Sequence, residues 1–396
     1  MRLAFDPGAR PPAVEARLGE LPVALFDDEL HYCAELVARY ATDLALEISV
    51  ALELEPALRR GVTLAEAAAS LGAGATFRPA LAALLERLVA AGEISASDSP
   101  RRYRATAPLR RGETAELRRL GVAVDRGIVA TLDLLDAAAA IYPAVAAGRT
   151  SAERELLGPR RLGLWTAYFS NANRLYALGN RIAALAAAAR LPCAPLRLLE
   201  VGAGAGSAAL TLLEELERRG RLAEVALYDL TEPNPAFRRR AERALAERFP
   251  GVTVRSRALD LDLPLAAQAR PGSYDLVYGV NVLHVARALG VTLAGLRDAL
   301  RPGAFLVAGE CLRPFPGQVV PADLVFELLR GFTAVEIDAE LRPRHGFLDP
   351  AAWRRALAAS GFDEVAVVPD VERLREHYPR FETGALCARR PPVQSP

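Results

Sequence analysis

The chain has 396 residues, of which 52% are hydrophobic and 24% are charged, so it can bury the cores of two or three domains and is not disordered throughout. Its 49 basic residues, all arginine, nearly balance 48 acidic residues, and the net charge of +1 gives no overall attraction to nucleic acid or to an anionic membrane. The four cysteines are scattered without a CxxC pair, which argues against a disulfide framework or a zinc ribbon and for a reduced, cytoplasmic setting.

Signals for membranes and metals are also missing. The N-terminus lacks the apolar run of a signal peptide, and no run of about 18 apolar residues predicts a membrane span. Since no HxxxH or HxxE cluster occurs, no metal site is predicted. The bias toward arginine and alanine is typical of a GC-rich bacterial genome.

The first half of the chain is predicted to be mostly helical. Residues 1–20 are rich in proline, glycine and arginine and are expected to form a loose arm, whereas apolar residues recur at helical spacing over 21–58. Residues 111–190 are predicted to form further helices that act as a linker or lid. Their last part is rich in aromatic and amide side chains, and three of these are candidates for contact with a substrate: Tyr168, Asn173 and Tyr176.

A winged-helix pattern lies between these helical segments. Thr63 precedes a short helix, and Glu66 occupies the capping-box position three residues later. A further helix over 78–91 is followed by two short strands around a polar tip at 95–102. Helix, turn, helix and hairpin in this order predict a winged-helix-like domain over 1–110.

After a proline-punctuated linker, the pattern changes to short apolar runs that alternate with amphipathic helices. Strands are predicted at 196–201, 225–228, 252–255, 274–279, 305–309, 364–368 and 384–388. Helices are predicted at 207–219, 236–248, 288–300 and 349–360. This alternation predicts an α/β domain over 191–396, with a parallel sheet covered by helices on both faces and a ligand site at the carboxyl ends of its strands.

A glycine-rich segment directly follows the first of these strands. It runs from Glu200 through Gly202, Gly204 and Gly206, where glycines allow positive φ and let a ligand approach the backbone. A dinucleotide-binding fingerprint would place its third glycine at 207, which is Ser207 here. The segment therefore departs from that fingerprint, and taken alone it is either a ligand-binding loop or only a tight turn between strand and helix.

An acidic side chain after the second strand is a candidate for binding ribose. Asp229 lies 23 residues after Gly206, where a carboxylate can accept hydrogen bonds from both ribose hydroxyls. The alternatives are a helix cap at Asp229 itself or a ribose-binding role for Glu232.

The ends of the third and fourth strands add further candidates. Asp260 and Leu261 follow the third strand, where a carboxylate suits the donor amino group of adenine, and Asp262 is the competing acid. Asn281 ends the fourth strand at the same edge of the sheet.

Together, these segments and the Pro-Gly turn before the fifth strand resemble class I S-adenosylmethionine-dependent methyltransferases, over about 190 residues. The resemblance implies a Rossmann-like, seven-stranded domain. It also implies that S-adenosylmethionine is the cofactor and that the candidates above bind it: Glu200, Gly202, Gly204, Gly206, Asp229, Asp260, Leu261 and Asn281.

A narrower resemblance lies within this region. The sequence Asn281-Val282-Leu283-His284, followed 26 residues after the histidine by Glu310, is similar to the carbon-methyltransferase domains of polyketide synthases. The resemblance implies that His284 and Glu310 form a base dyad that removes a proton from an acidic carbon next to a carbonyl. The chemistry fits, since imidazole titrates near neutral pH and a carboxylate on its other nitrogen sets the tautomer.

Other readings of the sequence remain open. The acceptor is expected to be a small molecule or natural product, free or carrier-bound, and methylation of a phenol, enol or carboxylate oxygen is the main alternative. A non-catalytic S-adenosylmethionine-binding regulator is another. The winged-helix module resembles that of small-molecule O-methyltransferases, where it serves dimerisation, and a homodimer is one arrangement that it allows. DNA binding by this module is disfavoured, because its second helix has few basic residues.

His345 is a candidate for the substrate pocket or for a surface turn, whereas His31 and His377 are expected to be ordinary packing or surface residues.

Overall fold

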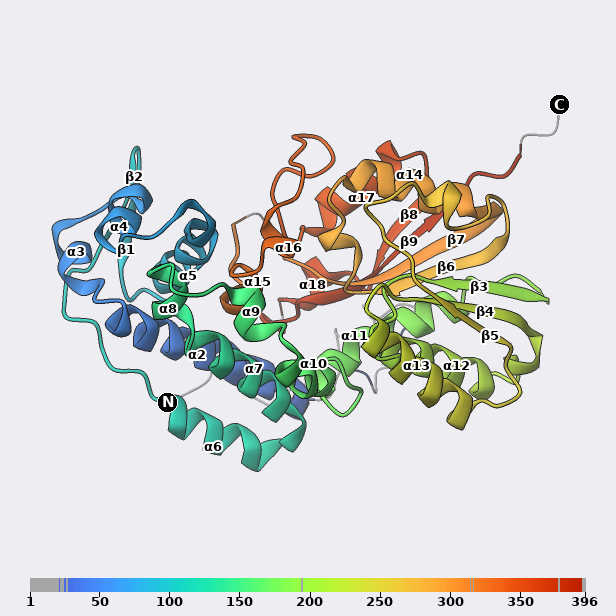
Figure 1. Cartoon of the computed structure of the whole chain (residues 1–396), viewed down its shortest axis with the longest axis horizontal. Helices are drawn as coiled ribbons and strands as arrows, with labels where there is room; N and C mark the ends of the chain where they lie inside the picture. The colour runs from blue at the N-terminus through green and yellow to red at the C-terminus, as the bar shows by residue number, and fades with distance from the viewer. Residues whose placement is uncertain are drawn as a thin grey trace. The chain divides into compact units, whose positions relative to one another are not determined.

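The computed structural model describes residues 21, 25, 28–193, 195–313, 315, 317–376 and 378–393 (Figure 1). The arm expected at 1–20 and His377 lie outside the described residues. The chain falls into two compact units, one comprising 28–168 with 317–333 and the other comprising the described parts of 169–316 and 334–396. The two units divide the chain between Tyr168 and Phe169. This division does not test the domain boundaries predicted near 110 and 190, which stay predictions.

The first unit is almost entirely helical. Its elements are α2 (Asp28–Ala51), α3 (Glu55–Arg60), α4 (Leu64–Ser70), η2 (Ala75–Phe77), α5 (Arg78–Ala90), β1 (Ser95–Asp98), β2 (Arg101–Arg104), α6 (Thr114–Val124), η3 (Arg126–Ile128), α7 (Val129–Ala139), α8 (Tyr142–Ala146), α9 (Ala152–Leu156), η4 (Pro159–Arg161), α10 (Leu162–Tyr168), α15 (Asp323–Phe326) and α16 (Arg330–Thr333). Along α2, residues at helical spacing such as Leu36, Tyr40 and Leu44 are buried against α5, α6 and α7. Burial of this stripe, more than helix propensity, stabilises the long helix.

The capping box at the start of α4 is formed as the sequence predicts. Thr63 Oγ1 accepts a hydrogen bond from the Glu66 amide at 3.2 Å, and Glu66 Oε2 accepts one from the Thr63 amide at 2.8 Å. The hairpin differs from the prediction, since β1 and β2 occupy most of the segment expected to be a polar tip. Polar residues cover both strands and only Tyr103 is buried, so the sequence carries no alternation from which to locate them. The winged-helix interpretation stays a prediction.

One described segment, Arg126–Ala146, is long and apolar enough to cross a membrane, with a mean hydropathy of 1.6 in its most apolar window. The segment is made of η3, α7 and α8. Core residues such as Leu132 and Leu135 are buried within the first unit. Length and composition are therefore the only features that it shares with a membrane span.

The second unit is built around a seven-stranded sheet of β3 (Leu196–Glu200), β4 (Val225–Thr231), β5 (Val254–Arg257), β6 (Tyr274–Val280), β7 (Leu300–Cys311), β8 (Asp363–Val368) and β9 (Thr383–Arg389). Its strand order is β5-β4-β3-β6-β7-β9-β8. The first five strands in sequence are parallel, whereas β9 runs antiparallel to both β7 and β8. This order confirms the predicted Rossmann-like α/β fold, and it places β3 beside the point where the order reverses, a place where such sheets bind ligands.

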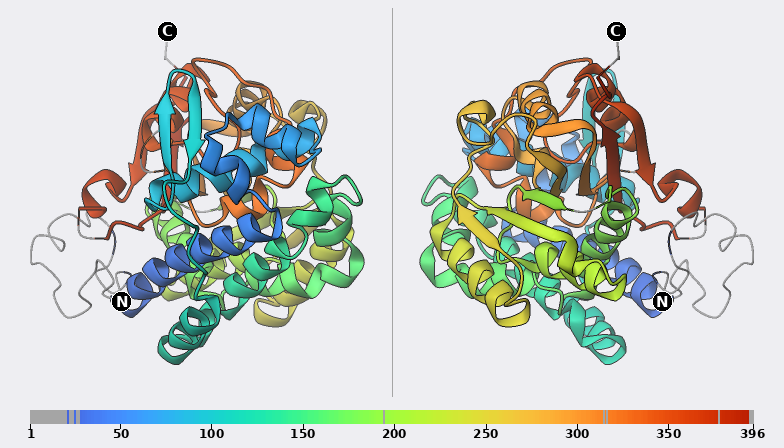
Figure 2. Two further views of the ribbon diagram at one scale, coloured as in Figure 1. Left: turned by 90° about the vertical axis from the view of Figure 1, so that its left-hand side faces the viewer. Right: turned by 90° about the vertical axis from the view of Figure 1, so that its right-hand side faces the viewer.

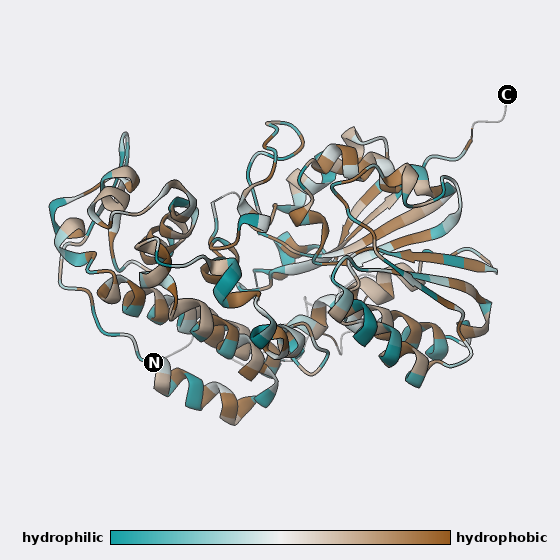
Figure 3. Cartoon of the chain, viewed as in Figure 1, coloured by the Kyte–Doolittle hydropathy of each residue, from teal (hydrophilic) through white to brown (hydrophobic). Residues whose placement is uncertain are grey.

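Helices cover both faces of this sheet. They are α11 (Arg174–Ala188), α12 (Ser207–Arg218), η5 (Leu222–Glu224), α13 (Pro235–Arg248), η6 (Leu265–Ala267), η7 (Leu283–Val285), α14 (Leu289–Ala299), α17 (Pro350–Ala359) and α18 (Val371–Leu374). In Figure 1, α11, α12 and α13 lie on one face, and α14 and α17 on the other. The side views of Figure 2 show the twist that such sheets have. The inner strand β6 is buried along its whole length and is mostly apolar (Figure 3), because both of its faces are covered.

Candidate active site

The glycine-rich segment connects the end of β3 to α12. Gly202 has a φ of +63°, and a Cβ there would come within 2.3 Å of Val282 Cγ2. Gly206 has a φ of +90°, and a Cβ there would meet the backbone and Cβ of Ala241 at about 3 Å. Gly204 also has a positive φ of +53°, but no atom lies within 4 Å of a Cβ built on it. Gly202 and Gly206 are thus required by the packing of the loop, whereas Gly204 faces open space.

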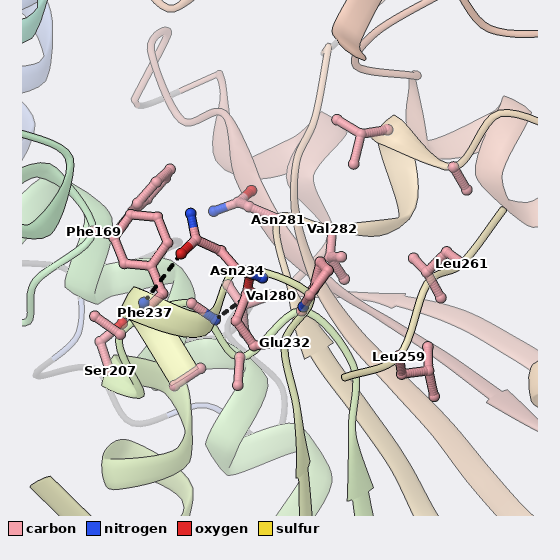
Figure 4. Close-up of a pocket in the computed structure, with 18 of the residues that line it drawn as sticks. Phe169, Ser207, Glu232, Asn234, Phe237, Leu259, Leu261, Val280, Asn281 and Val282 are labelled. Carbon is pink, nitrogen blue, oxygen red and sulfur yellow. Dashed lines mark hydrogen bonds between the residues drawn. The ribbon is translucent and has the colours of Figure 1, made fainter. Parts of the chain in front are cut away.

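This open space is a pocket of about 430 Å³ at the carboxyl ends of the central strands (Figure 4). Six of the sequence-predicted residues line it: Tyr176, Gly202, Gly204, Asp260, Leu261 and Asn281. Further lining side chains that the sequence analysis did not single out include Phe169, Asn234 and Phe237. Phe237 lies in the first turn of α13. The position of this helix directly after the second strand was the only sequence signal that could have pointed to Phe237.

Glu232, which the sequence analysis named only as a competitor of Asp229, lies in this pocket (Figure 4). Its Oε2 accepts a hydrogen bond from the Gly204 amide at 3.0 Å, and its Oε1 accepts one from the Asn234 amide at 2.8 Å. Burial raises the pKa of Glu232, although these two amide hydrogen bonds oppose the effect. The carboxylate therefore ties the glycine loop to the end of the second strand.

Asp229, predicted to bind ribose, lies outside the pocket. Its carboxylate is fully buried and accepts hydrogen bonds from Arg255 Nε at 3.1 Å, Arg257 Nη2 at 3.0 Å and the Tyr274 hydroxyl at 2.5 Å. Burial would raise the pKa of Asp229, but the hydrogen bonds from the two arginines lower it below its usual value. Asp229 lies away from the pocket because β4 continues to Thr231, which leaves Asp229 inside the strand.

Asp260 and Leu261 line the pocket from the connection after β5. Gln268 holds this connection in place: its Nε2 donates to the Asp260 carbonyl at 2.8 Å, and its Oε1 accepts from the Asp260 amide at 2.8 Å. Asp260 Oδ1 accepts from the Asp262 amide at 2.9 Å, and Asp262 Oδ1 accepts from the Arg287 amide at 2.7 Å. Asp262 thus holds the backbone at Arg287, whereas Asp260 is an exposed acid that lines the pocket.

Asn281 projects into the pocket from the end of β6 (Figure 4). Its φ of +52° is in the left-handed region, and its Oδ1 accepts a hydrogen bond from the Cys311 amide at 2.9 Å. A hydrogen bond with Asn281 partly offsets the burial that raises the pKa of Tyr176. The Tyr176 ring packs against Phe169 with 5.3 Å between the ring centroids. These contacts join β6, β7 and α11 around one side of the pocket.

Glu200 lies at the end of β3, below the glycine loop, and is not among the residues that line the pocket. Its Oε2 accepts a hydrogen bond from the Tyr228 hydroxyl at 2.9 Å, while Oε1 is buried without a partner among the described residues. Burial raises the pKa of Glu200 to about 8. The side chain is therefore mostly protonated at neutral pH.

His284 and Glu310 form a buried pair beside the pocket. Nδ1 of His284 lies 2.6 Å from Oε2 of Glu310, and both side chains are at most 5% exposed. Oε1 of Glu310 accepts hydrogen bonds from the Val282 and Leu283 amides at 3.2 and 2.8 Å. Val282 and Val285 line the pocket on either side of His284, whereas His284 and Glu310 themselves are not among the residues that line it.

Two side chains from a later loop fix the backbone and the ring of this histidine. The buried guanidinium of Arg342 donates hydrogen bonds to the carbonyls of His284 and Ala286. Burial lowers the pKa of Arg342 to about 10, against the attraction of Glu310 and Asp262. The Phe347 ring lies 4.8 Å from the imidazole, centroid to centroid. The sequence analysis missed both residues, since neither lies in a motif.

The remaining predicted residues do not line this pocket. Tyr168 ends α10 in the first unit, where its ring packs on Trp165 and Phe326. Asn173 is buried at the start of α11, and His345 is half-buried in the loop before α17. Within the described part of the chain, no three His, Cys, Asp or Glu side chains are grouped as a metal site would require.

Comparison with known proteins matches part of this chain to a family. Residues 199–306 match the family described as methyltransferase domain. The methyltransferase calH of Penicillium decumbens is 35% identical over 175 residues, which are 44% of this chain and 45% of that protein. The polyketide synthase ThaQ of Burkholderia thailandensis is 34% identical over 179 residues, which are 45% of this chain and 8% of the synthase. The matched part thus spans less than half the length of either relative.

Solved structures resemble the fold over nearly its whole length. The CurJ carbon methyltransferase has a TM-score of 0.73 at 23% identity, with 96% of each chain covered. The trans-methyltransferase CalH, solved with SAH (S-adenosylhomocysteine), has a TM-score of 0.62 at 21% identity, with 98% of each chain covered. The family match, the strand order and the glycine-loop pocket together identify the chain as one that carries a class I S-adenosylmethionine-dependent methyltransferase domain.

Proposed function

We propose that this protein transfers a methyl group to an acidic carbon next to a carbonyl in a small-molecule or natural-product acceptor. The observation that carries the proposal is the buried contact of 2.6 Å between His284 Nδ1 and Glu310 Oε2 beside the glycine-loop pocket. The names of the relatives, which include polyketide synthases and a trans-acting methyltransferase, support an acceptor of the polyketide kind, either free or carrier-bound.

The pocket fits S-adenosylmethionine, which when bound supplies an electrophilic methyl group on a sulfonium. Its volume of about 430 Å³ is in the range of small-ligand sites, and the open side of Gly204 leaves room for a ligand against the backbone. Glu232 would accept the ribose hydroxyls and Asp260 the adenine amino group, while Leu261 and Phe237 offer apolar surface to the base. Glu232 replaces Asp229 in this role, because Asp229 is enclosed by arginines.

In this proposal the His284–Glu310 dyad supplies the base. When Nδ1–H of the neutral imidazole donates to Glu310, Nε2 carries the lone pair that can accept a proton from the acceptor carbon. The Glu310 carboxylate then stabilises the imidazolium, and its hydrogen bonds from Val282 and Leu283 keep it in place. A positioned base of this kind contributes on the order of 10²–10⁴ in rate.

Two substitutions test the dyad. In His284→Ala no base remains. In Glu310→Gln the amide nitrogen faces Nδ1, so Nε2 would carry the proton and could not accept another. We expect both to lower the rate of methylation of a β-ketothioester by about 10²–10⁴, with the calorimetric Kd for SAH changed less than about threefold.

His345→Ala serves as the matched control, since His345 does not line the pocket. Its rate should stay close to that of the unmodified protein. A product methylated on oxygen, or a His284→Ala variant with an undiminished rate, would refute carbon methylation by this dyad.

A further inference from the structure

The second unit contains another cavity, of about 870 Å³, at the opposite edge of the sheet from the glycine loop. Arg197 and Arg301 line it from the second positions of β3 and β7, whereas the glycine loop follows the end of β3. Arg255 and Arg257 line it from β5, and Arg270 from the segment that precedes β6. We call this site, defined by its five arginines, the arginine cavity.

The cavity has an excess of positive charge. Asp229 accepts hydrogen bonds from Arg255 and Arg257, and Asp275 Oδ1 accepts one from Arg301 Nη1 at 2.5 Å. The arginines lower the pKa of Asp229 against the effect of its burial, so this carboxylate is ionised at neutral pH. Five guanidinium groups therefore meet two carboxylates, and three positive charges remain without a neutralising partner in the cavity.

Several of its hydrogen-bond donors are uncommitted. The guanidinium groups of Arg197 and Arg270 make no ion pair or hydrogen bond with the residues that the structure describes. Arg255 and Arg257 each turn Nε and Nη2 toward Asp229, which leaves Nη1 of both side chains for another acceptor. Donors from four arginines thus surround one cavity.

We propose that the arginine cavity binds a phosphate-bearing anion with two or more negative charges. Guanidinium forks match phosphate oxygens in pairs, and a multiply charged anion would neutralise the excess of three. The rest of the wall is small, with Ala266, Ala267, Ala269 and Pro271, and its one aromatic hydroxyl, that of Tyr274, is bonded to Asp229. Because the wall offers no free aromatic face for a stacked base, the site favours the phosphate groups themselves over a strand of nucleic acid.

Titration calorimetry of the full chain with pyrophosphate tests this proposal, at about 0.15 M NaCl so that exposed charges are screened. We expect saturable binding with one site per chain, and weaker binding of inorganic phosphate. Adenosine 3′,5′-bisphosphate is a second arm: tighter binding than pyrophosphate would identify a phosphoester as the source, and weaker binding would identify a free phosphoanion.

The double variant Arg197→Gln/Arg270→Gln should weaken pyrophosphate binding at least tenfold without lowering the unfolding temperature, because neither side chain neutralises a buried acid. Arg239→Gln is the matched control: it removes one exposed arginine of α13 that does not line the cavity. Pyrophosphate binding that is absent at this salt concentration overturns the proposal. A loss of pyrophosphate affinity in Arg239→Gln equal to that in the double variant also overturns it. Displacement of pyrophosphate by an oligonucleotide, in a way that depends on Arg239, overturns it too.

Discussion

Asp229 and Glu232 lie three residues apart, yet only Glu232 lines the glycine-loop pocket. Both acids follow the second strand as the sequence predicted it, at 225–228, and spacing from the glycine loop alone favoured Asp229. The strand continues past Asp229, however, and the side chain on that face meets Arg255 and Arg257. Nothing in the local sequence shows that two arginines on β5 will lie opposite, because strand pairing is a long-range property.

We therefore expect Glu232→Ala to weaken S-adenosylmethionine binding by tenfold or more, since it removes a carboxylate from the pocket. Asp229→Asn should change this affinity less than threefold but lower the free energy of unfolding by about 1–3 kcal/mol, because it leaves two arginines without their acid. Calorimetry and urea denaturation measure the two effects. If Asp229→Asn instead weakens S-adenosylmethionine binding and Glu232→Ala lowers only the stability, Asp229 is the ribose ligand.

Glu200 gives the protein a pH-dependent stability. Its pKa is raised from 4.5 to about 8 by burial, so the folded protein holds a proton that the unfolded chain releases. The stabilisation is complete below about pH 4.5 and is lost as the pH rises through about 8. Glu232, whose pKa is also raised, acts in the same direction.

Glu200→Gln should remove much of this slope. The variant is expected to gain on the order of 1–3 kcal/mol relative to the unmodified protein between pH 5 and pH 8, when urea denaturation is compared at both values. The Tyr228 hydroxyl can still donate to the amide oxygen. Parallel pH profiles for the two proteins would show that Glu200 is ionised in the fold.

At the scale of elements, periodicity predicted the strands and helices of the second unit well. Apolar runs mark strands that are buried on both faces, and the capping box marks the start of α4. The ends of strands were predicted less well, because hydrogen bonding to a neighbour can extend a strand through polar residues, as in β4 and the β1–β2 hairpin. Site residues at strand ends share this weakness, whereas the glycine loop does not, since its spacing is local.

The glycine loop itself can be tested with two substitutions. Gly204→Val places a side chain in open space, so it should abolish detectable S-adenosylmethionine binding at a stability cost of about 1–2 kcal/mol from its positive φ. Gly202→Ala should be more destabilising despite its smaller side chain, since its Cβ would overlap Val282. Thermal unfolding and calorimetry separate the two effects, and unchanged affinity in Gly204→Val would remove the loop from the site.

For the whole molecule, the sequence predicted a mostly helical part followed by an α/β part, and the domain boundaries near 110 and 190 stay predictions. The segment 317–333 groups with the N-terminal helices although it lies between strands of the sheet in sequence. Such an excursion rests on contacts among residues far apart in the chain, such as the Tyr142 hydroxyl that donates to the Leu324 carbonyl at 2.9 Å. The pattern of hydrophobic residues along the sequence cannot predict contacts between residues so far apart.

Two units imply two responses to a ligand. SAH at about 100 times its Kd should stabilise the unit that binds it by about 2.7 kcal/mol. We expect its protection against hydrogen exchange to concentrate in β3, β4, β6 and α12, with little change in α2–α5. Equal protection throughout would indicate that the chain unfolds as one cooperative body.

Gln268 lines the arginine cavity, while its amide group holds the backbone of Asp260, which lines the other pocket. The segment between β5 and β6 therefore lines both the glycine-loop pocket and the arginine cavity. Grafting this stretch from a relative to alter nucleoside preference would reshape the basic site as well, so engineering of the two recognition properties cannot proceed independently along it.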